Sequence, residues 1–213
     1  MIRLGTLGGL GSLVTGRSVA PVTPEAPAPP VGAAPDDPTL RPRPRDTQRS
    51  RVYRAESAVP SSPLPGLPAC ASFADRVVGS LWWTARFPDH TLAGVPRLRP
   101  GNGARQAFYR EDPDGPTITL PRRYRTKGVV LHELVHWALR ADDDLANHGP
   151  TFTRILLDAT AEFCGPERAD LLAAAYAEQR VKVGPAPAPG PDGGLVYGAD
   201  ERARQSSRRI SAG

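Results

Sequence analysis

The sequence predicts an α+β fold, in which a small antiparallel sheet packs with a central apolar helix and flanking helices between two disordered tails. Three observations lead to this prediction. Many of the 25 prolines gather toward the two ends of the chain, short strand-like segments occur in the middle, and helical spacing dominates after residue 128. A length of 213 residues suits one ordinary domain with tails.

The two ends differ in composition from the middle. Residues 1–45 are rich in Pro, Ala and Gly and carry few large apolar side chains, so they predict a disordered arm. Residues 184–213 return to Pro and Gly and end in an arginine-rich stretch, which predicts a disordered basic tail. The folded domain is therefore expected over residues 46–183.

The first half of this domain predicts short elements. Residues 51–55 alternate polar and apolar side chains like a short strand. From Ser72, a candidate N-cap, the spacing of Phe73, Val77 and Leu81 predicts an amphipathic helix. Strand character then appears at residues 95–98, 107–109 and 117–120, with turn formers between them, and these segments predict the antiparallel sheet.

The second half predicts three helices. Residues 129–139 form a largely apolar run that only His132, Glu133 and His136 interrupt. After a loop, Pro150 suits the first turn of a second helix, whose apolar residues keep helical spacing as far as residue 163. A last helix is expected over residues 167–181. Polar side chains on a helix that is otherwise so apolar need a reason.

The spacing of His132, Glu133 and His136 is that of a zinc site. Histidines four residues apart lie one turn apart on the same face of a helix, so both imidazoles reach one tetrahedral ion. A glutamate directly after the first histidine can contact the metal-bound water. The sequence therefore predicts one zinc ion per chain, with Glu133 as catalytic base of a hydrolase.

A catalytic zinc ion usually has three protein ligands and one open position. His148 is the leading candidate for the third ligand, because eleven residues after His136 allow the first helix to end and the chain to turn back. The alternatives are three aspartates of the loop and two acidic residues of the next helix. The two residues of the helix could instead orient a ligand imidazole by accepting a hydrogen bond from it. These residues are Asp142, Asp143, Asp144, Asp158 and Glu162.

The donor that would stabilise the oxyanion of the reaction is left open by the sequence. Tyr124, Tyr109 and His90 are possible donors and none of them is assigned. Tyr109 lies in an expected strand, Tyr124 precedes the metal-binding helix, and His90 lies in a turn.

At this point the motifs support a resemblance. His132-Glu133-Leu134-Val135-His136 followed by His148-Gly149-Pro150-Thr151-Phe152 resembles the core of the SprT-like zinc metalloproteases, a family that includes Spartan. Residues 46–183 are also similar to SprT-like metallohydrolases of GC-rich bacteria and their phages. The resemblance implies a zincin-like fold, zinc ligands at His132, His136 and His148, and Glu133 as base in peptide-bond hydrolysis. The Cys/His ribbon that follows the Spartan protease core is absent from this sequence.

Composition limits the remaining expectations. The net charge is +5 and nearly all cations are arginines, so a nucleic-acid-associated protease or binding module is one alternative to a peptidase acting on free peptides or proteins. A non-catalytic structural zinc domain is another. Two cysteines, Cys70 and Cys164, are too few for a disulfide framework and fit a reducing cytoplasm. No apolar run is long enough for a membrane span, and the sequence does not predict the oligomeric state.

Overall fold

The computed structural model describes residues 44–142, 144–191 and 194–210. The predicted disordered arm over residues 1–45 therefore lies almost wholly outside the described residues. In chain order the elements are α1 (Arg49–Ala58), α2 (Leu67–Val78), α3 (Leu81–Thr84), α4 (Pro88–Ala93), β1 (Arg97–Pro100), β2 (Phe108–Asp112), β3 (Gly115–Leu120), the 3-10 turn η1 (Arg122–Tyr124), α5 (Lys127–Ala138), α6 (Pro150–Cys164), α7 (Pro166–Glu178), β4 (Ala188–Pro189), β5 (Leu195–Val196) and α8 (Ala199–Ile210).

The main sheet confirms the α+β class and corrects one detail of it. Its strand order is β1-β3-β2, and β2 and β3 form an antiparallel hairpin that turns at Gly115, where a φ of 105° favours glycine. β1 pairs with β3 in parallel, with Leu98 opposite Ile118, so the sheet is mixed and the expected antiparallel pairing holds for β2 with β3 alone. β1 and β2 lie at the two edges of the sheet, and the hairpin brings β3 back between them. β3 therefore runs antiparallel to β2 and parallel to β1.

α1 replaces the strand that was predicted for residues 51–55. Val52, Ala55 and Val59 are buried, and their spacing of three and four residues is that of one helix face. Five alternating residues are too few to distinguish the period of a strand from that of a helix. The packing of α1 against α7 buries one helix face and so stabilises the helix. The correction matters because α1 contributes side chains to the metal centre described below.

α2 begins earlier than the sequence predicts. Its first residue is Leu67, with Pro68 in the first turn, so Ser72 lies inside the helix and does not cap it. The helix ends at Val78, and Ser80 instead caps α3 by accepting a hydrogen bond from the Trp83 amide.

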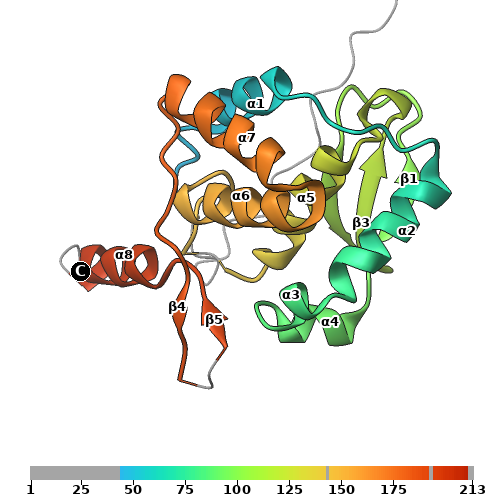
Figure 1. Ribbon diagram of the computed structural model, residues 1–213. Helices are drawn as coiled ribbons and strands as arrows, with labels where there is room; N and C mark the ends of the chain where they lie inside the picture. The colour runs from blue at the N-terminus through green and yellow to red at the C-terminus, as the bar shows by residue number, and fades with distance from the viewer. Residues whose placement is uncertain (1–43, 143, 192–193, 211–213) are drawn as a thin grey trace, which may run out of the picture. The chain divides into compact units, whose positions relative to one another are not determined.

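α5, α6 and α7 confirm the predicted helical second half. Thr126 caps α5 by accepting a hydrogen bond from the Val129 amide, and Gly165 separates α6 from α7 with a φ of 96°. α6 packs against both α5 and α7, while α5 also contacts α2 and β2 (Figure 1). α5 is thus enclosed on several sides, which explains why the sequence around its histidines is apolar.

The expectation of a disordered basic tail over residues 184–213 is also corrected, because the described residues of this segment form β4, β5 and α8. Tyr197 is buried, stacks on Phe87 with ring centroids 6.2 Å apart, and donates a hydrogen bond to Asp158 over 3.0 Å. The Glu201 carboxylate accepts hydrogen bonds from the amide and hydroxyl of Thr151 at the start of α6. These polar and aromatic anchors, which composition does not reveal, attach the C-terminal segment to the domain.

Candidate metal centre

α5 carries the first two candidate ligands and the candidate base. His132 and Glu133 are almost fully enclosed, at 2% and 3% exposure, whereas His136 is partly open. The Nε2 atoms of His132 and His136 lie 3.0 Å apart, as expected for residues one turn apart whose rings converge. An enclosed polar cluster on an apolar helix is stable only when its members have partners, and the surrounding segments supply them.

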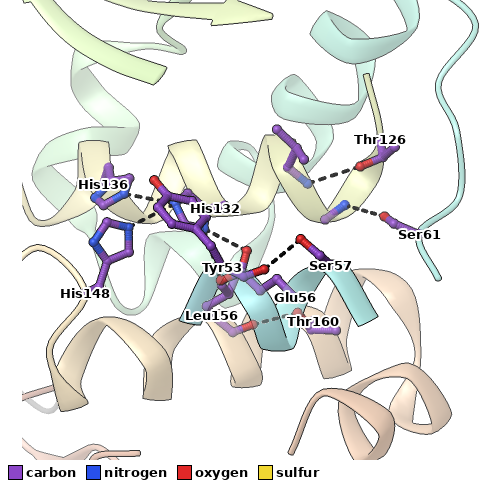
Figure 2. A network of polar contacts seen from close by, with 12 residues as sticks. Tyr53, Glu56, Ser57, Ser61, Thr126, His132, His136, His148, Leu156 and Thr160 are labelled. Carbon is purple, nitrogen blue, oxygen red and sulfur yellow. Dashed lines mark hydrogen bonds and ion pairs between the residues drawn. The ribbon is translucent and has the colours of Figure 1, made fainter. Parts of the chain in front are cut away.

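His148 completes the cluster from the loop before α6. Its Nε2 atom lies 3.4 Å from that of His132, and its backbone carbonyl accepts a hydrogen bond from the Gln48 side chain over 2.8 Å. The candidate ligand atoms of His132, His136 and His148 all lie within 4.8 Å of one another. Figure 2 shows the three rings converging from two segments of the chain. The predicted three-histidine group, which could hold a metal ion, is therefore present.

Two of the three separations between the imidazole nitrogens fit a tetrahedral ion. Two nitrogens bound at about 2.0–2.1 Å to one tetrahedral zinc ion lie about 3.3–3.4 Å apart. The separations of 3.0 Å and 3.4 Å agree with that spacing to within a few tenths of an ångström. Two imidazole nitrogens at such distances without a shared proton or cation would repel each other through their lone pairs.

Two carboxylates orient two of these rings. Glu56 of α1 accepts from Nδ1 of His132 at 2.9 Å, and Asp46 accepts from Nδ1 of His148 at 2.7 Å. Because a carboxylate can only accept, each contact places the proton on Nδ1 and leaves the Nε2 lone pair free for a metal. Neither residue was a candidate from sequence, and the two predicted for this role, Asp158 and Glu162, do not perform it.

The same carboxylates shape the electrostatics of the rings. Burial lowers the pKa of His132, but the charge of Glu56 and its hydrogen bond outweigh burial and raise that pKa overall. Burial and the neighbouring His132 lower the pKa of His148, and Asp46 only partly opposes them. In both cases the carboxylate stabilises a cation at the ring, which is the charge that a bound metal ion would supply.

Glu133 lies where two cavities meet. The first, of about 630 Å³ and called here the metal cavity, contains Glu133, His136 and His148 in its wall. Burial raises the pKa of the Glu133 carboxyl, whereas His132 and a hydrogen bond from the backbone amide of Tyr109 lower it. Its carboxylate is thus held beside the histidines by β2 and faces a space large enough for a ligand.

Tyr53 of α1 is a site residue that the sequence did not indicate. Its ring lies 5.3 Å from that of His132 and 5.0 Å from that of His148, and it lines the metal cavity together with Glu133. Burial raises the pKa of its hydroxyl, and the nearby Glu133 raises it further. Tyr53 therefore presents a protonated hydroxyl group in the wall of this cavity (Figure 2).

The acidic alternatives for the third ligand have other partners. Asp142 pairs with Arg202 at 2.5 Å, and Asp158 pairs with Arg154 and accepts from Tyr197. Glu162 is exposed on α6, and Asp144 lines another cavity, whose wall also contains Asp46 and His148. Asp143 lies outside the described residues. Within the described part of the chain, these acids do not join the three histidines.

The three candidates for an oxyanion donor are placed differently. The Nε2 atom of His90 lies 3.1 Å from the carbonyl oxygen of Trp137, so that residue stabilises the end of α5. The Tyr109 hydroxyl donates to Glu111 at the edge of the metal cavity. Tyr124 lines the second cavity with Glu133. The ring of Tyr53, by contrast, contacts two of the three histidines.

The carboxylates of Asp46 and Glu56 should strengthen metal binding through the rings that they contact. Replacing Asp46 by Asn or Glu56 by Gln should weaken metal binding by roughly 10- to 100-fold, because the ring loses a negative partner and its tautomer is no longer fixed. Competition with a fluorescent zinc chelator measures this affinity. Glu162→Gln, at an exposed carboxylate of α6, is the matched control and should bind metal like the wild type. Equal affinity in all four proteins would disprove the orienting role.

No protein family, curated protein or solved structure matches this chain.

Among the described helices, none has both the length and the apolar character needed to cross a membrane. Cys70 and Cys164 are free thiols.

Proposed function

We propose that this protein is a zinc-dependent metallohydrolase, and more specifically a peptidase that uses Glu133 as general base. The observation that carries the proposal is the convergence of three imidazoles beside a buried glutamate on the wall of an open cavity. A structural zinc site usually has four protein ligands and is closed, whereas the described residues supply three. The open side of the cluster favours catalysis over a purely structural role.

The nature of the ligands favours zinc. Imidazole nitrogen is a common zinc ligand, and a three-histidine set with one open position is one of the usual catalytic arrangements. In that position a zinc ion would polarise a substrate carbonyl and acidify a water molecule. The tautomers fixed by Glu56 and Asp46 suit such an ion, because they direct Nε2 of His132 and His148 inward.

The residues of the chain have distinct roles in the proposed reaction. The Glu133 carboxylate accepts a proton from the attacking water and returns it to the leaving amine. Its side chain is almost fully enclosed, and the Tyr109 amide holds it in place. The hydrogen-bonded rings of His132 and His148 are fixed in orientation before substrate arrives, so little reorganisation accompanies the reaction.

The choice of the peptide bond as substrate rests on the motifs. The sequence His132-Glu133-Leu134-Val135-His136 with His148-Gly149-Pro150-Thr151-Phe152 resembles the core of SprT-like zinc metalloproteases. Phe152 packs against all three histidine rings, at 4.6 to 5.0 Å between centroids, so the second motif has a physical connection to the first. Gly149 leaves room for the Glu201 carboxylate, which would lie 3.0 Å from a Cβ atom at this position.

Tyr53 is our candidate for the oxyanion donor. Tyr53→Phe should lower kcat for peptide cleavage by roughly 10²- to 10³-fold and leave zinc content unchanged, because it removes one hydrogen-bond donor and keeps the ring on the histidines. Steady-state kinetics with parallel metal analysis test this prediction. Tyr124→Phe is the control in the second cavity. A Tyr53→Phe enzyme with wild-type kcat would assign the donor elsewhere.

The proposed function is tested by removing and restoring the metal. Purified protein should cleave unstructured proteins or a peptide library, lose this activity when a chelator removes the metal, and regain it with stoichiometric zinc. Cleavage that persists in the chelated, metal-free protein would disprove a metal-dependent reaction. Absence of cleavage from the zinc-loaded protein across the library would argue against a peptidase.

A further inference from the structure

A second cavity adjoins the metal cavity at Glu133. It measures about 570 Å³ and is bordered by α1, α5, α6 and α7. We call it the apolar cavity, because its wall contains the side chains of Val59, Tyr124, Val129, Leu156 and Leu172. The two cavities share Tyr53, Gln106, Ala107 and Glu133. A ligand that crosses Glu133 therefore has the metal cavity on one side and the apolar cavity on the other.

The periodicity of α5 sets the distance from Glu133, which both cavities share, to Val129 in the apolar cavity. Val129 and Glu133 are four residues apart and share one helix face, with His136 a further three residues along. Four helical residues rise by about 6 Å, whereas one residue of an extended peptide spans about 3.3 Å. A substrate residue one or two positions from the reacting carbonyl thus reaches Val129.

Most polar groups in the wall of the apolar cavity already have partners. The Thr160 hydroxyl donates to the Leu156 carbonyl, and the Ser57 hydroxyl donates to the Tyr53 carbonyl. Ser61 accepts from the Gly128 amide. Glu56 is engaged by His132. Apolar surface is what remains for a ligand to contact, and its burial is favourable in proportion to its area.

Arg168 is the cation that lies deepest in this wall, and it too is engaged. Its Nη1 atom lies 3.5 Å from the Val59 carbonyl oxygen. Its Nη2 atom packs closely over Gly128, where it would lie only 2.6 Å from an added Cβ atom. The Nε atom has no partner among the described residues, but it is buried and so does not face the cavity. Arg168 therefore covers the start of α5, and its guanidinium forms one part of the wall beside the apolar side chains.

We propose that the apolar cavity is a specificity pocket, which receives a large apolar side chain of the substrate within one or two residues of the cleaved bond. This inference rests on the proposed peptidase function and adds a substrate class to it. The pocket selects against small side chains because they leave its apolar wall in contact with water. It has the size of ordinary ligand pockets, for which 300–1,000 Å³ is typical.

The test compares peptide pairs that carry Phe or Ala at a single position on either side of the cleaved bond. Wild type should cleave the better Phe peptide with a kcat/KM roughly 10- to 100-fold above its Ala partner. Val129→Phe fills the pocket and should reduce that ratio to about one. Leu171→Phe adds the same ring at an exposed position of α7 outside both cavities and is the matched control, which should keep the preference.

Binding separates this proposal from the proposed function. Zinc-loaded Glu133→Gln protein with fluorescein-labelled peptides reports affinity without cleavage, and its preference for Phe should vanish when Val129→Phe is added. Ser57→Trp fills the pocket from an exposed position of α1 and should act alike if Val129→Phe does not fold. Equal affinity for Phe and Ala peptides would overturn the pocket even if the wild type cleaves both. Loss of the preference in the filled variants supports the pocket even if no peptide is cleaved.

Discussion

Glu133→Gln should abolish peptide hydrolysis while the protein keeps its zinc. The amide has the shape of the carboxylate but cannot accept a proton from water, and the loss of a general base typically costs about 10²- to 10⁴-fold in rate. Zinc content should not change, because the three ligand nitrogens come from His132, His136 and His148. Single-turnover cleavage assays and metal analysis of the same preparation measure both quantities.

The control for this variant is a second carboxylate of the same cavity. Glu111 lines the metal cavity from β2 but is exposed and pairs with Tyr109 and Arg140, so Glu111→Gln should retain most of the activity. A Glu133→Gln enzyme that cleaves at the wild-type rate would show that another group takes the proton. Loss of zinc together with activity would instead show that Glu133 belongs to the metal site itself.

His148→Ala should lose the metal under conditions in which the wild type retains it. Removing one of three ligands leaves two nitrogens on one helix, and the entropy of fixing the loop before α6 is no longer offset by a metal bond. Added zinc should therefore raise the Tm of the wild type but not that of His148→Ala, because a ligand that binds only the native state stabilises it. Differential scanning fluorimetry across a zinc titration measures this shift.

The fourth histidine supplies the control for the ligand variant. His90 lies outside the cluster and contacts the Trp137 carbonyl at the end of α5. His90→Ala removes this contact and should lower the absolute Tm, so the zinc-dependent rise in Tm is the quantity compared. An equal rise in His148→Ala and His90→Ala would remove His148 from the ligand set.

The parts of the site that sequence predicts are those set by local spacing. His132, Glu133 and His136 follow from one helical turn, and His148 follows from the length of loop that brings the chain back. Glu56 and Asp46 could not be found in this way, because they lie 76 and 102 residues before the histidines they orient. Tyr53 shares that difficulty, since the alternation of its segment predicts a strand and its role depends on where α1 packs.

The differences between the fold predicted from sequence and the observed fold have similar causes. The alternation at residues 51–55 was too short to separate a strand from a helix, and only the contact between α1 and α7 decides. The parallel pairing of β1 with β3 depends on which strand enters the middle of the sheet, which no local pattern specifies. The C-terminal segment is attached by single contacts such as Tyr197 to Asp158, and average composition does not register these.

The metal content of the purified protein tests the central claim most directly. Inductively coupled plasma mass spectrometry of the wild type, with the triple variant His132→Ala, His136→Ala, His148→Ala beside it, should give about one zinc ion per wild-type chain and almost none in the variant. A wild type that neither carries zinc nor takes it up at micromolar concentration, or a triple variant that binds as much zinc as the wild type, would contradict the metal centre and the hydrolase built on it.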